Sequence, residues 1–328
     1  MKEKKAKFCA WKYRELHGNW GQMYQYVYNA LESMGVDIQV SQYLNSVYPA
    51  IVDEEDALYI YNHTNIEQLK EEGYHLGKQT IILKPTAPTP DYFSIDSLGY
   101  AAYSSIAYDK PSFENTEVKW DFVENLKKEK VNKWSDRKDL LFIENKTKVP
   151  DNHVLVLCQM QGDETVTQQS FGNHWHKIEA IVNNLKGHYP LVIKVHPTMK
   201  SEESKLGNNW DYYEKVINHW ISEGITVIYG MESIHDILPK TKVAIVENST
   251  SGLECMMYDV PVISFGYPEY HWVTKDLRHL PALKSYINDL SWWSKDNSRK
   301  FLYWYITEYL CYDQESTTKR IKELIDGK

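Results

Sequence analysis

The stretch Val243–Tyr270 reads VAIVENSTSGLECMMYDVPVISFGYPEY. Its apolar residues 243–246 predict a strand, the small polar residues that follow predict a turn, and the residues from 251 onward predict a short helix. This helix runs straight into Asp259–Gly266, which predicts a second strand. A strand followed by a hydroxyl-rich turn and a helix start places side-chain and backbone donors where an anion binds. The stretch therefore predicts a parallel α/β sheet with an anion site at its edge.

Small polar side chains in this turn are the candidate ligands of the anion. They are Asn248, Ser249, Thr250 and Ser251, with Glu254 in the first helical turn. Asn248 and the preceding Glu247 lie at the carboxyl end of the strand, where open parallel sheets bind ligands, and the phosphate of a nucleotide-sugar fits there. The alternative is that these residues only cap the helix, because Asn, Ser and Thr are preferred at that position in any helix.

The composition is that of a soluble globular protein. Apolar residues make up 42% and charged residues 25% of the 328 residues. No run of about 18 apolar residues predicts a transmembrane helix, and the first residues lack the apolar core of a signal peptide. Three of the four cysteines (Cys9, Cys158, Cys255 and Cys311) lie in apolar runs, which is typical of the buried reduced thiols of a cytoplasmic protein.

Net charge and aromatic content indicate which ligands to expect. The net charge of −8 disfavours an extended nucleic-acid-binding surface. The chain contains 25 Tyr and 11 Trp residues, whose flat rings with a polar edge suit carbohydrate binding as well as core packing. These features favour a small-molecule or glycan ligand over a nucleic acid.

Strands alternate with helices along most of the chain, which predicts parallel sheets covered on both faces. The clearest predicted elements are strands at 154–157, 191–195 and 243–246, and helices at 174–186, 210–222, 292–310 and 317–325. The polar stretch at 145–152 marks a domain boundary. We therefore predict an α/β fold with an N-terminal Rossmann-like acceptor domain over 1–148 and a C-terminal Rossmann-like donor domain over 149–290. Aromatic-rich helices over 291–328 are expected to pack across the two domains, which face a cleft in the GT-B arrangement of glycosyltransferases.

A carboxylate follows the first strand of the predicted donor domain. Gln159 and Asp163 lie directly after this strand, and Gly162 lets the chain bend so that Asp163 reaches the rim of the cleft. A carboxylate there can act as a general base on an acceptor hydroxyl or as a nucleophile on an anomeric carbon. The alternative is that Asp163 only caps a turn or a helix.

A histidine and a lysine end the next strand of the same domain. Pro197 keeps the preceding backbone extended, so His196 projects from the strand end instead of starting a helix. Its imidazole can donate a hydrogen bond or a proton to a leaving phosphate. Lys194 lies two residues earlier on the same face of the strand and can neutralise phosphate charge.

The loop before the first helix is the candidate acceptor site. His17, Asn19 and Trp20 lie among glycines at a helix start, although an ordinary βα turn explains them equally well. No Asp-x-Asp sequence is present, and His174 and His176 have no third ligand at a suitable spacing. We therefore expect no metal site.

With these residues in view, the sequence resembles the capsule polysaccharide biosynthesis family, which includes the bacterial β-Kdo transferases. The matching pieces, in order, are Pro90–Gly99 (PDYFSIDSLG), Gln159-x-x-x-Asp163, Lys194-x-His196-Pro197, Ser249–Glu254, Pro261–Gly266 and Tyr270. Their order and spacing agree with the family over roughly residues 80–275. Each motif alone is weak evidence, but four motifs in the family's order are fairly specific.

The resemblance implies a GT-B glycosyltransferase that uses no metal and no cofactor, with a CMP- or UDP-linked sugar as co-substrate. By position in the motifs, Asp163 would be the catalytic carboxylate, and His196 would lie near the donor phosphate. Residues 249–251 would hold the donor. The expected reaction is transfer of a Kdo-like sugar to a hydroxyl of a glycan or glycolipid.

Two other functions stay open at this point. A phage-type glycosyltransferase that modifies a hydroxymethylated DNA base would need a basic cleft in spite of the net charge of −8. A non-catalytic nucleotide-sugar-binding protein would need a decayed site, yet both Asp163 and His196 are present.

Overall fold

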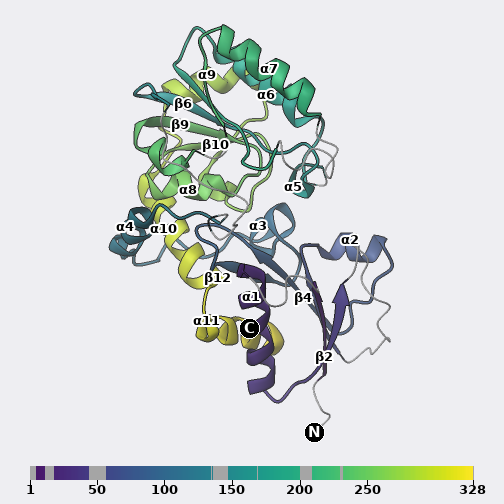
Figure 1. Cartoon of the computed structure of the whole chain (residues 1–328). Helices are drawn as coiled ribbons and strands as arrows, with labels where there is room; N and C mark the ends of the chain where they lie inside the picture. Colours follow the sequence, from purple (N-terminus) through teal and green to yellow (C-terminus); the bar gives the residue numbers. More distant parts are fainter. Residues whose placement is uncertain are drawn as a thin grey trace. The chain divides into compact units, whose positions relative to one another are not determined.

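The computed structural model describes residues 5–11, 18–43, 57–133, 135, 147–167, 169–199, 209–229 and 232–327. The side chains of residues 9–11, 18–20 and 41–43 lie outside this description. Contacts divide the chain into two compact units (Figure 1). The first unit comprises residues 1–111, 131–137 and 304–328, and the second comprises residues 112–130 and 138–303.

The contacts divide the chain at different positions from the predicted domains. The segment 112–130, within the predicted N-terminal domain 1–148, belongs to the second unit. It contains α4 (Trp120–Glu129), where the Arg299 guanidinium lies 4.2 Å from the ring centroid of Trp120. The predicted C-terminal segment 291–328 is shared between the units at residue 304. These assignments depend on aromatic and charged contacts between segments far apart in the sequence, which local patterns do not reveal.

The sheet of the first unit has six strands in the order β12-β5-β4-β3-β1-β2. The strands are β1 (Lys5–Trp11), β2 (Asp37–Tyr43), β3 (Leu58–Asn62), β4 (Gln79–Pro85), β5 (Phe93–Asp96) and β12 (Leu310–Cys311). The first four are parallel, as predicted, but β5 runs antiparallel to β4, and β12 runs antiparallel to β5. The antiparallel edge arises because a short loop, and no crossover helix, joins β4 to β5.

Helices α1 (Gly18–Ser33) and α11 (Gln314–Asp326) pack side by side in the first unit (Figure 1). Smaller helices are α2 (Ile66–Glu71) and α3 (Ser105–Tyr108). The predicted helix over 292–310 is wrong at its end. The α-helix α10 (Lys295–Trp304) is followed by a π-helical turn at Tyr305–Tyr309, and the chain then enters β12 because residues 310 and 311 pair with β5.

The sheet of the second unit has six parallel strands in the order β11-β10-β9-β6-β7-β8. The strands are β6 (His153–Leu157), β7 (Leu191–Lys194), β8 (Thr226–Ile228), β9 (Thr241–Val246), β10 (Val262–Ser264) and β11 (Lys275–Asp276). Numbered within the unit, this is the 3-2-1-4-5-6 order of a Rossmann fold. The strand order therefore reverses between β6 and β9, and the crevice at their carboxyl ends is where such sheets bind ligands.

The second unit contains seven α-helices among the described residues, and two of them, α6 (His174–Leu185) and α7 (Trp210–Ser222), meet at an aromatic centre. The others are α4, α5 (Glu164–Thr167), α8 (Ser251–Met257), α9 (Leu283–Asn288) and α10. Trp175 of α6 is fully buried and stacks on Tyr213 and Trp220 of α7, at ring-centroid distances of 4.4 and 5.9 Å. Within the described residues, no helix combines the length and apolarity needed to cross a membrane.

The cysteines whose side chains are described are free and buried. They are Cys158, Cys255 and Cys311. Burial raises the pKa of Cys158 and of Cys311 to about 12 and raises that of Cys255 well above its usual value. The thiols are therefore neutral and poorly nucleophilic. The predicted burial of the thiols is confirmed for these three residues.

A buried carboxylate ties the C-terminal segment to the sheet of the first unit. Asp96, at the end of β5, is completely buried. Its oxygens accept hydrogen bonds from the backbone of Leu98, Gly99 and Ser105, from the Ser105 hydroxyl, and from the Tyr309 hydroxyl at 2.9 Å. These bonds satisfy a charge that would be costly to bury alone.

We predict that Tyr309→Phe lowers the free energy of unfolding by about 1.5–3 kcal/mol, the usual contribution of a hydrogen bond to a charged group. Urea denaturation measures this change. The control is Tyr28→Phe on α1, a residue that is 36% exposed, where loss of the hydroxyl should cost less than about 0.5 kcal/mol. Equal losses in the two variants would contradict a stabilising role for the Tyr309–Asp96 bond.

Candidate functional site

The carboxyl ends of three neighbouring strands in the second unit bring most of the predicted site residues to one edge. Gln159 and Asp163 follow β6, His196 follows β7, and the turn 248–251 follows β9. Lys194 is the last residue of β7. This edge includes the point between β6 and β9 where the strand order reverses, so it is the expected ligand site of the sheet.

Gln159 and Asn248 join β6 to β9 at that point. The backbone N–H of Asn248 donates to Oε1 of Gln159 at 2.9 Å. The Asn248 side chain donates to the carbonyl of Thr165 at 2.7 Å and accepts from the backbone N–H of Tyr267 at 2.5 Å. Both side chains are buried, and their amides hold neighbouring loops in place. Direct donor contact by these two residues stays a prediction.

Asp163 lies at the start of the short helix α5. Its Oδ1 accepts hydrogen bonds from the backbone N–H and the hydroxyl of Thr165, and its carbonyl accepts from the N–H groups of Val166 and Thr167. The capping role considered from the sequence is therefore present in the structure. The side chain is only partly buried, so capping leaves room for a catalytic role as well.

His196 is linked to β6 through Thr198. Its Nδ1 accepts a hydrogen bond from the backbone N–H of Thr198 at 3.3 Å and lies 3.1 Å from the Thr198 hydroxyl. The same hydroxyl lies 3.2 Å from the sulfur of Met160. Because Nδ1 is an acceptor, the neutral ring carries its proton on Nε2. Nε2 is therefore the nitrogen that can donate to a ligand.

Lys194 is a buried cation among carboxylates. Burial lowers the pKa of Lys194 to about 8, although attraction to Glu254 and Glu232 opposes this decrease. Glu254 lies in the first turn of α8 and is buried as well. The structure thus brings Lys194 and Glu254 close together. In the sequence, the two residues were linked only because both lie in motifs of the family that the chain resembles.

The turn between β9 and α8 is packed tightly against Tyr270. The Tyr270 hydroxyl donates to the carbonyl of Ser249, and a Cβ at Gly252 would collide with the Tyr270 ring. The Ser249 hydroxyl accepts from the N–H of Ser251 at 3.2 Å. Thr250 is the N-cap residue of α8, and its side chain makes no capping hydrogen bond. Simple capping therefore accounts for only part of this hydroxyl cluster.

A buried ion cluster beneath this edge was missed in the sequence. Glu247 is completely buried and accepts hydrogen bonds from His174, Lys177 and Ser170. Burial raises the pKa of Glu247, but these three hydrogen bonds outweigh that effect and hold the pKa below its usual value. The only sequence signal was a Glu at a strand end and a His-x-His pair that lacks a third metal ligand.

Hydrogen bonds connect this buried cluster to Asp163. His174 donates through Nδ1 to Glu247, and its Nε2 accepts from the backbone N–H of Gln159 at 2.9 Å. The Gln159 side chain donates to the Thr165 hydroxyl at 3.2 Å, and that hydroxyl donates to Asp163. The chain of bonds directs Nδ1–H of His174 toward Glu247 and orients the Asp163 carboxylate.

The predicted acceptor residues lie at the edge of what the structure describes. His17 is outside the described residues. Asn19 and Trp20 lie in the first turn of α1, where only the backbone is described. Their role in acceptor binding stays a prediction.

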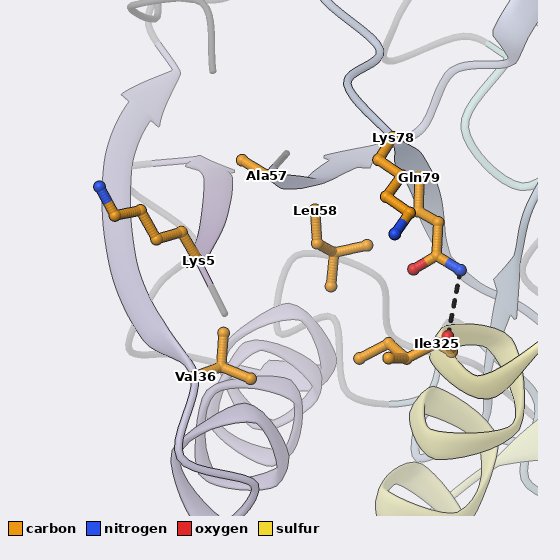
Figure 2. Close-up of a pocket in the computed structure, with 7 residues that line it drawn as sticks. All are labelled: Lys5, Val36, Ala57, Leu58, Lys78, Gln79 and Ile325. Atoms are coloured by element: carbon orange, nitrogen blue, oxygen red, sulfur yellow. Dashed lines mark hydrogen bonds between the residues drawn. The ribbon is translucent and has the colours of Figure 1, made fainter. Parts of the chain in front are cut away.

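A cavity of about 310 Å³ lies elsewhere, at the amino ends of the strands in the first unit (Figure 2). It is lined by Lys5, Val36, Ala57, Leu58, Lys78, Gln79 and Ile325. Lys5, Leu58 and Gln79 are the first residues of β1, β3 and β4. Parallel sheets bind ligands at the opposite, carboxyl ends of their strands. We therefore do not assign the active site to this cavity.

The sequence predicts no metal site, and the side chains that could form one are those of His, Cys, Asp and Glu. No group of three or more His, Cys, Asp or Glu residues suited to a metal ion occurs in the described ranges. The clustered carboxylates and histidines at the strand ends are instead engaged with lysines, hydroxyls and backbone groups. Metal-independent chemistry stays a prediction.

Comparison with known families assigns the chain to a family. The model of the capsule polysaccharide biosynthesis protein family matches residues 107–281, which is more than half of the chain. The chain belongs to this family. The match covers the segments after β6, β7 and β9, so the resemblance inferred from the motifs is confirmed. No curated protein sequence matches the chain significantly.

Two solved structures resemble this member of the capsule biosynthesis family along almost its whole length. The β-Kdo 2,4 transferase KpsC of Thermosulfurimonas dismutans is 14% identical and gives a TM-score of 0.50, with 99% of this chain and 98% of that chain covered. The β-Kdo 2,7 transferase of the same KpsC is 14% identical and gives a TM-score of 0.52, with 99% of both chains covered. At this identity the likeness establishes the fold. The predicted GT-B type of fold with two Rossmann-like units is confirmed.

We predict that Gly252→Ala destabilises this family member by about 1–3 kcal/mol, the usual cost of overpacking. The new methyl group collides with Tyr270, which is buried and cannot move away without breaking its bond to Ser249. Urea denaturation without ligand measures the effect. Ser251→Ala is the control, because it keeps the backbone N–H that bonds Ser249. Equal free energies of unfolding for Gly252→Ala and Ser251→Ala would show that the added methyl group does not collide with the Tyr270 ring.

Proposed function

We propose that the protein is a metal-independent glycosyltransferase that moves a Kdo-like sugar from a CMP- or UDP-linked donor to a hydroxyl of a glycan or glycolipid. One observation carries this proposal. A carboxylate, an imidazole, an ammonium group and a cluster of hydroxyls lie together where the strand order of the second unit reverses. Membership of the capsule biosynthesis family supports the same chemistry.

In this proposal the donor phosphate binds between β7 and the turn after β9. The hydroxyls of Ser249, Thr250 and Ser251 donate to its oxygens, and Nε2–H of His196 points a further donor at them. Lys194 supplies the positive charge. Oriented donors of this kind stabilise the charge that grows on a leaving phosphate.

Asp163 carries the chemical step in the proposal. The bond between the anomeric carbon and the donor phosphate breaks, the phosphate leaves with the bonding electrons, and the acceptor oxygen forms the new bond. In a direct displacement, Asp163 removes the proton from the acceptor hydroxyl. In a two-step reaction, Asp163 first bonds to the anomeric carbon as the phosphate leaves; the acceptor oxygen then displaces Asp163, and the proton of the acceptor hydroxyl passes to the departed phosphate. Both routes need the ionised carboxylate that the Thr165 bonds orient.

We predict that Asp163→Asn lowers the turnover rate by at least about two orders of magnitude, the usual scale of acid–base catalysis. Donor affinity should change far less, because the group acts mainly in the transition state. The asparagine oxygen can still accept from the Thr165 N–H, so the melting temperature should stay close to that of the parent. Turnover with a panel of CMP- and UDP-sugars, together with donor binding, measures both effects.

The control for this variant is Glu164→Gln, which neutralises the adjacent carboxylate. It should keep a turnover rate close to that of the parent. A near-normal rate in Asp163→Asn with a lower melting temperature would reduce Asp163 to a capping residue and overturn the proposed step.

We predict that donor affinity decreases as the pH rises through about 8, because Lys194 then loses its proton and its positive charge. If the donor binds only the protonated form, affinity falls by up to about tenfold per pH unit above that pKa. Titration calorimetry from pH 7.5 to pH 9.5 tests this, since the donor phosphate itself does not titrate there. Lys194→Met should bind more weakly and show no such pH dependence. An equally steep dependence in Lys194→Met would exclude Lys194 as the titrating group.

A further inference from the structure

Three aromatic rings form a column after β10 in the second unit. The rings of Tyr267 and His271 stack at a centroid distance of 4.2 Å with 27° between their planes. His271 and Trp272 lie 4.1 Å apart with 39° between their planes. Tyr267 is the outer ring, and 44% of the residue is exposed. We call Tyr267, His271 and Trp272 the aromatic column.

The aromatic column is fixed to the turn proposed to hold the donor phosphate. The backbone N–H of Tyr267 donates to Oδ1 of Asn248, the residue that opens this turn. Tyr270, which lies between Tyr267 and His271 in the sequence, donates a hydrogen bond from its hydroxyl to the carbonyl of Ser249. A Cβ at Gly266 would collide with Asn248, so the glycine allows this close approach. The segment that carries the column is therefore bonded directly to the turn.

The chemistry of the column suits a flat aromatic ligand. His271 covers one face of the Tyr267 ring, so the exposed area lies on the remaining face and edges. Burial lowers the pKa of His271, so the imidazole is neutral near pH 7 and stacks as an aromatic ring. Tyr offers a large rigid surface with few rotatable bonds, and bases stack on such rings whatever their sequence.

We propose that Tyr267 forms the stacking platform for the nucleobase of the donor, with His271 and Trp272 supporting it from behind. This inference rests on the proposed function, because it assumes that the donor phosphate binds at residues 249–251. A nucleotide joins its base to its phosphate through one ribose. We infer that a nucleotide whose phosphate binds at the turn brings its base to the Tyr267 ring on the segment bonded to that turn.

The test uses the full chain and three ligands, CMP, UMP and ribose 5-phosphate, with buffer alone as the blank. Calorimetry should show CMP or UMP binding between about fivefold and about a hundredfold more weakly to Tyr267→Ala, the range expected for base stacking. Tyr267→Phe keeps the ring and should bind within about twofold of the parent. Ribose 5-phosphate lacks the base, so its binding should be the same in all three proteins.

Tyr229→Ala is the matched control. Tyr229 follows β8 and is 44% exposed, as Tyr267 is, but it lies outside the column. Its loss should leave nucleotide binding unchanged, and melting temperatures show whether each variant is folded.

The outcomes separate this inference from the proposed function. If the parent binds neither nucleotide, the proposed donor site itself is wrong. If the parent binds a nucleotide and Tyr267→Ala binds it equally well, stacking on Tyr267 is overturned and the donor site stands. If Tyr267→Ala weakens ribose 5-phosphate as much as CMP, Tyr267 supports the turn and is not a base platform.

Discussion

The hydrogen bond between the Asn248 backbone and the Gln159 side chain joins the two strands at which the order of the second sheet reverses. The chain moves away from the carboxyl ends of β6 and β9 into separate loops, so the polar groups there cannot all be satisfied by the sheet ladder. The two side-chain amides fill this need, and both also bond Thr165. The positions of α5, of Asp163 and of the segment after β10 therefore all depend on this pair.

The buried carboxylate of Glu247 explains how the Gln159–Asn248 pair is held in place. Burying Glu247 alone would be very unfavourable, and breaking a buried ion pair commonly costs several kcal/mol. His174, Lys177 and Ser170 offset that burial with three hydrogen bonds, and His174 passes the constraint to the Gln159 backbone. The Asp163 carboxylate is thus held by Thr165 and Gln159. These residues are in turn held by the hydrogen bond from the Gln159 backbone to His174. Such support is what a precisely oriented catalytic group requires.

Local sequence patterns predicted much of the second sheet and two of the helices around it, but not the side-chain contacts between distant segments. The helix predicted over 210–222 coincides with α7, because an Asn cap and an amphipathic repeat both lie within the segment. The Glu247–His174 contact spans 73 positions and has no local pattern. The antiparallel strands β5 and β12 were missed for a related reason. Strand β5 lies in a Pro-rich stretch. Strand β12 is two residues long and is recognised as a strand only because it pairs with β5.

The charges around Lys194 decide how an anion can bind at this edge. Glu254 and Glu232 both act on Lys194, and the nearby Cys158 thiol is neutral. One ammonium group facing two carboxylates cannot attract a phosphate by net charge alone. In the proposed site, oriented neutral donors close to the phosphate oxygens therefore add to the attraction of the Lys194 ammonium group, and such donors act strongly where water is excluded. A turn built from hydroxyls, together with Nε2–H of His196, supplies donors of that kind. In this way the proposed site is compatible with an anionic donor although the chain carries a net charge of −8.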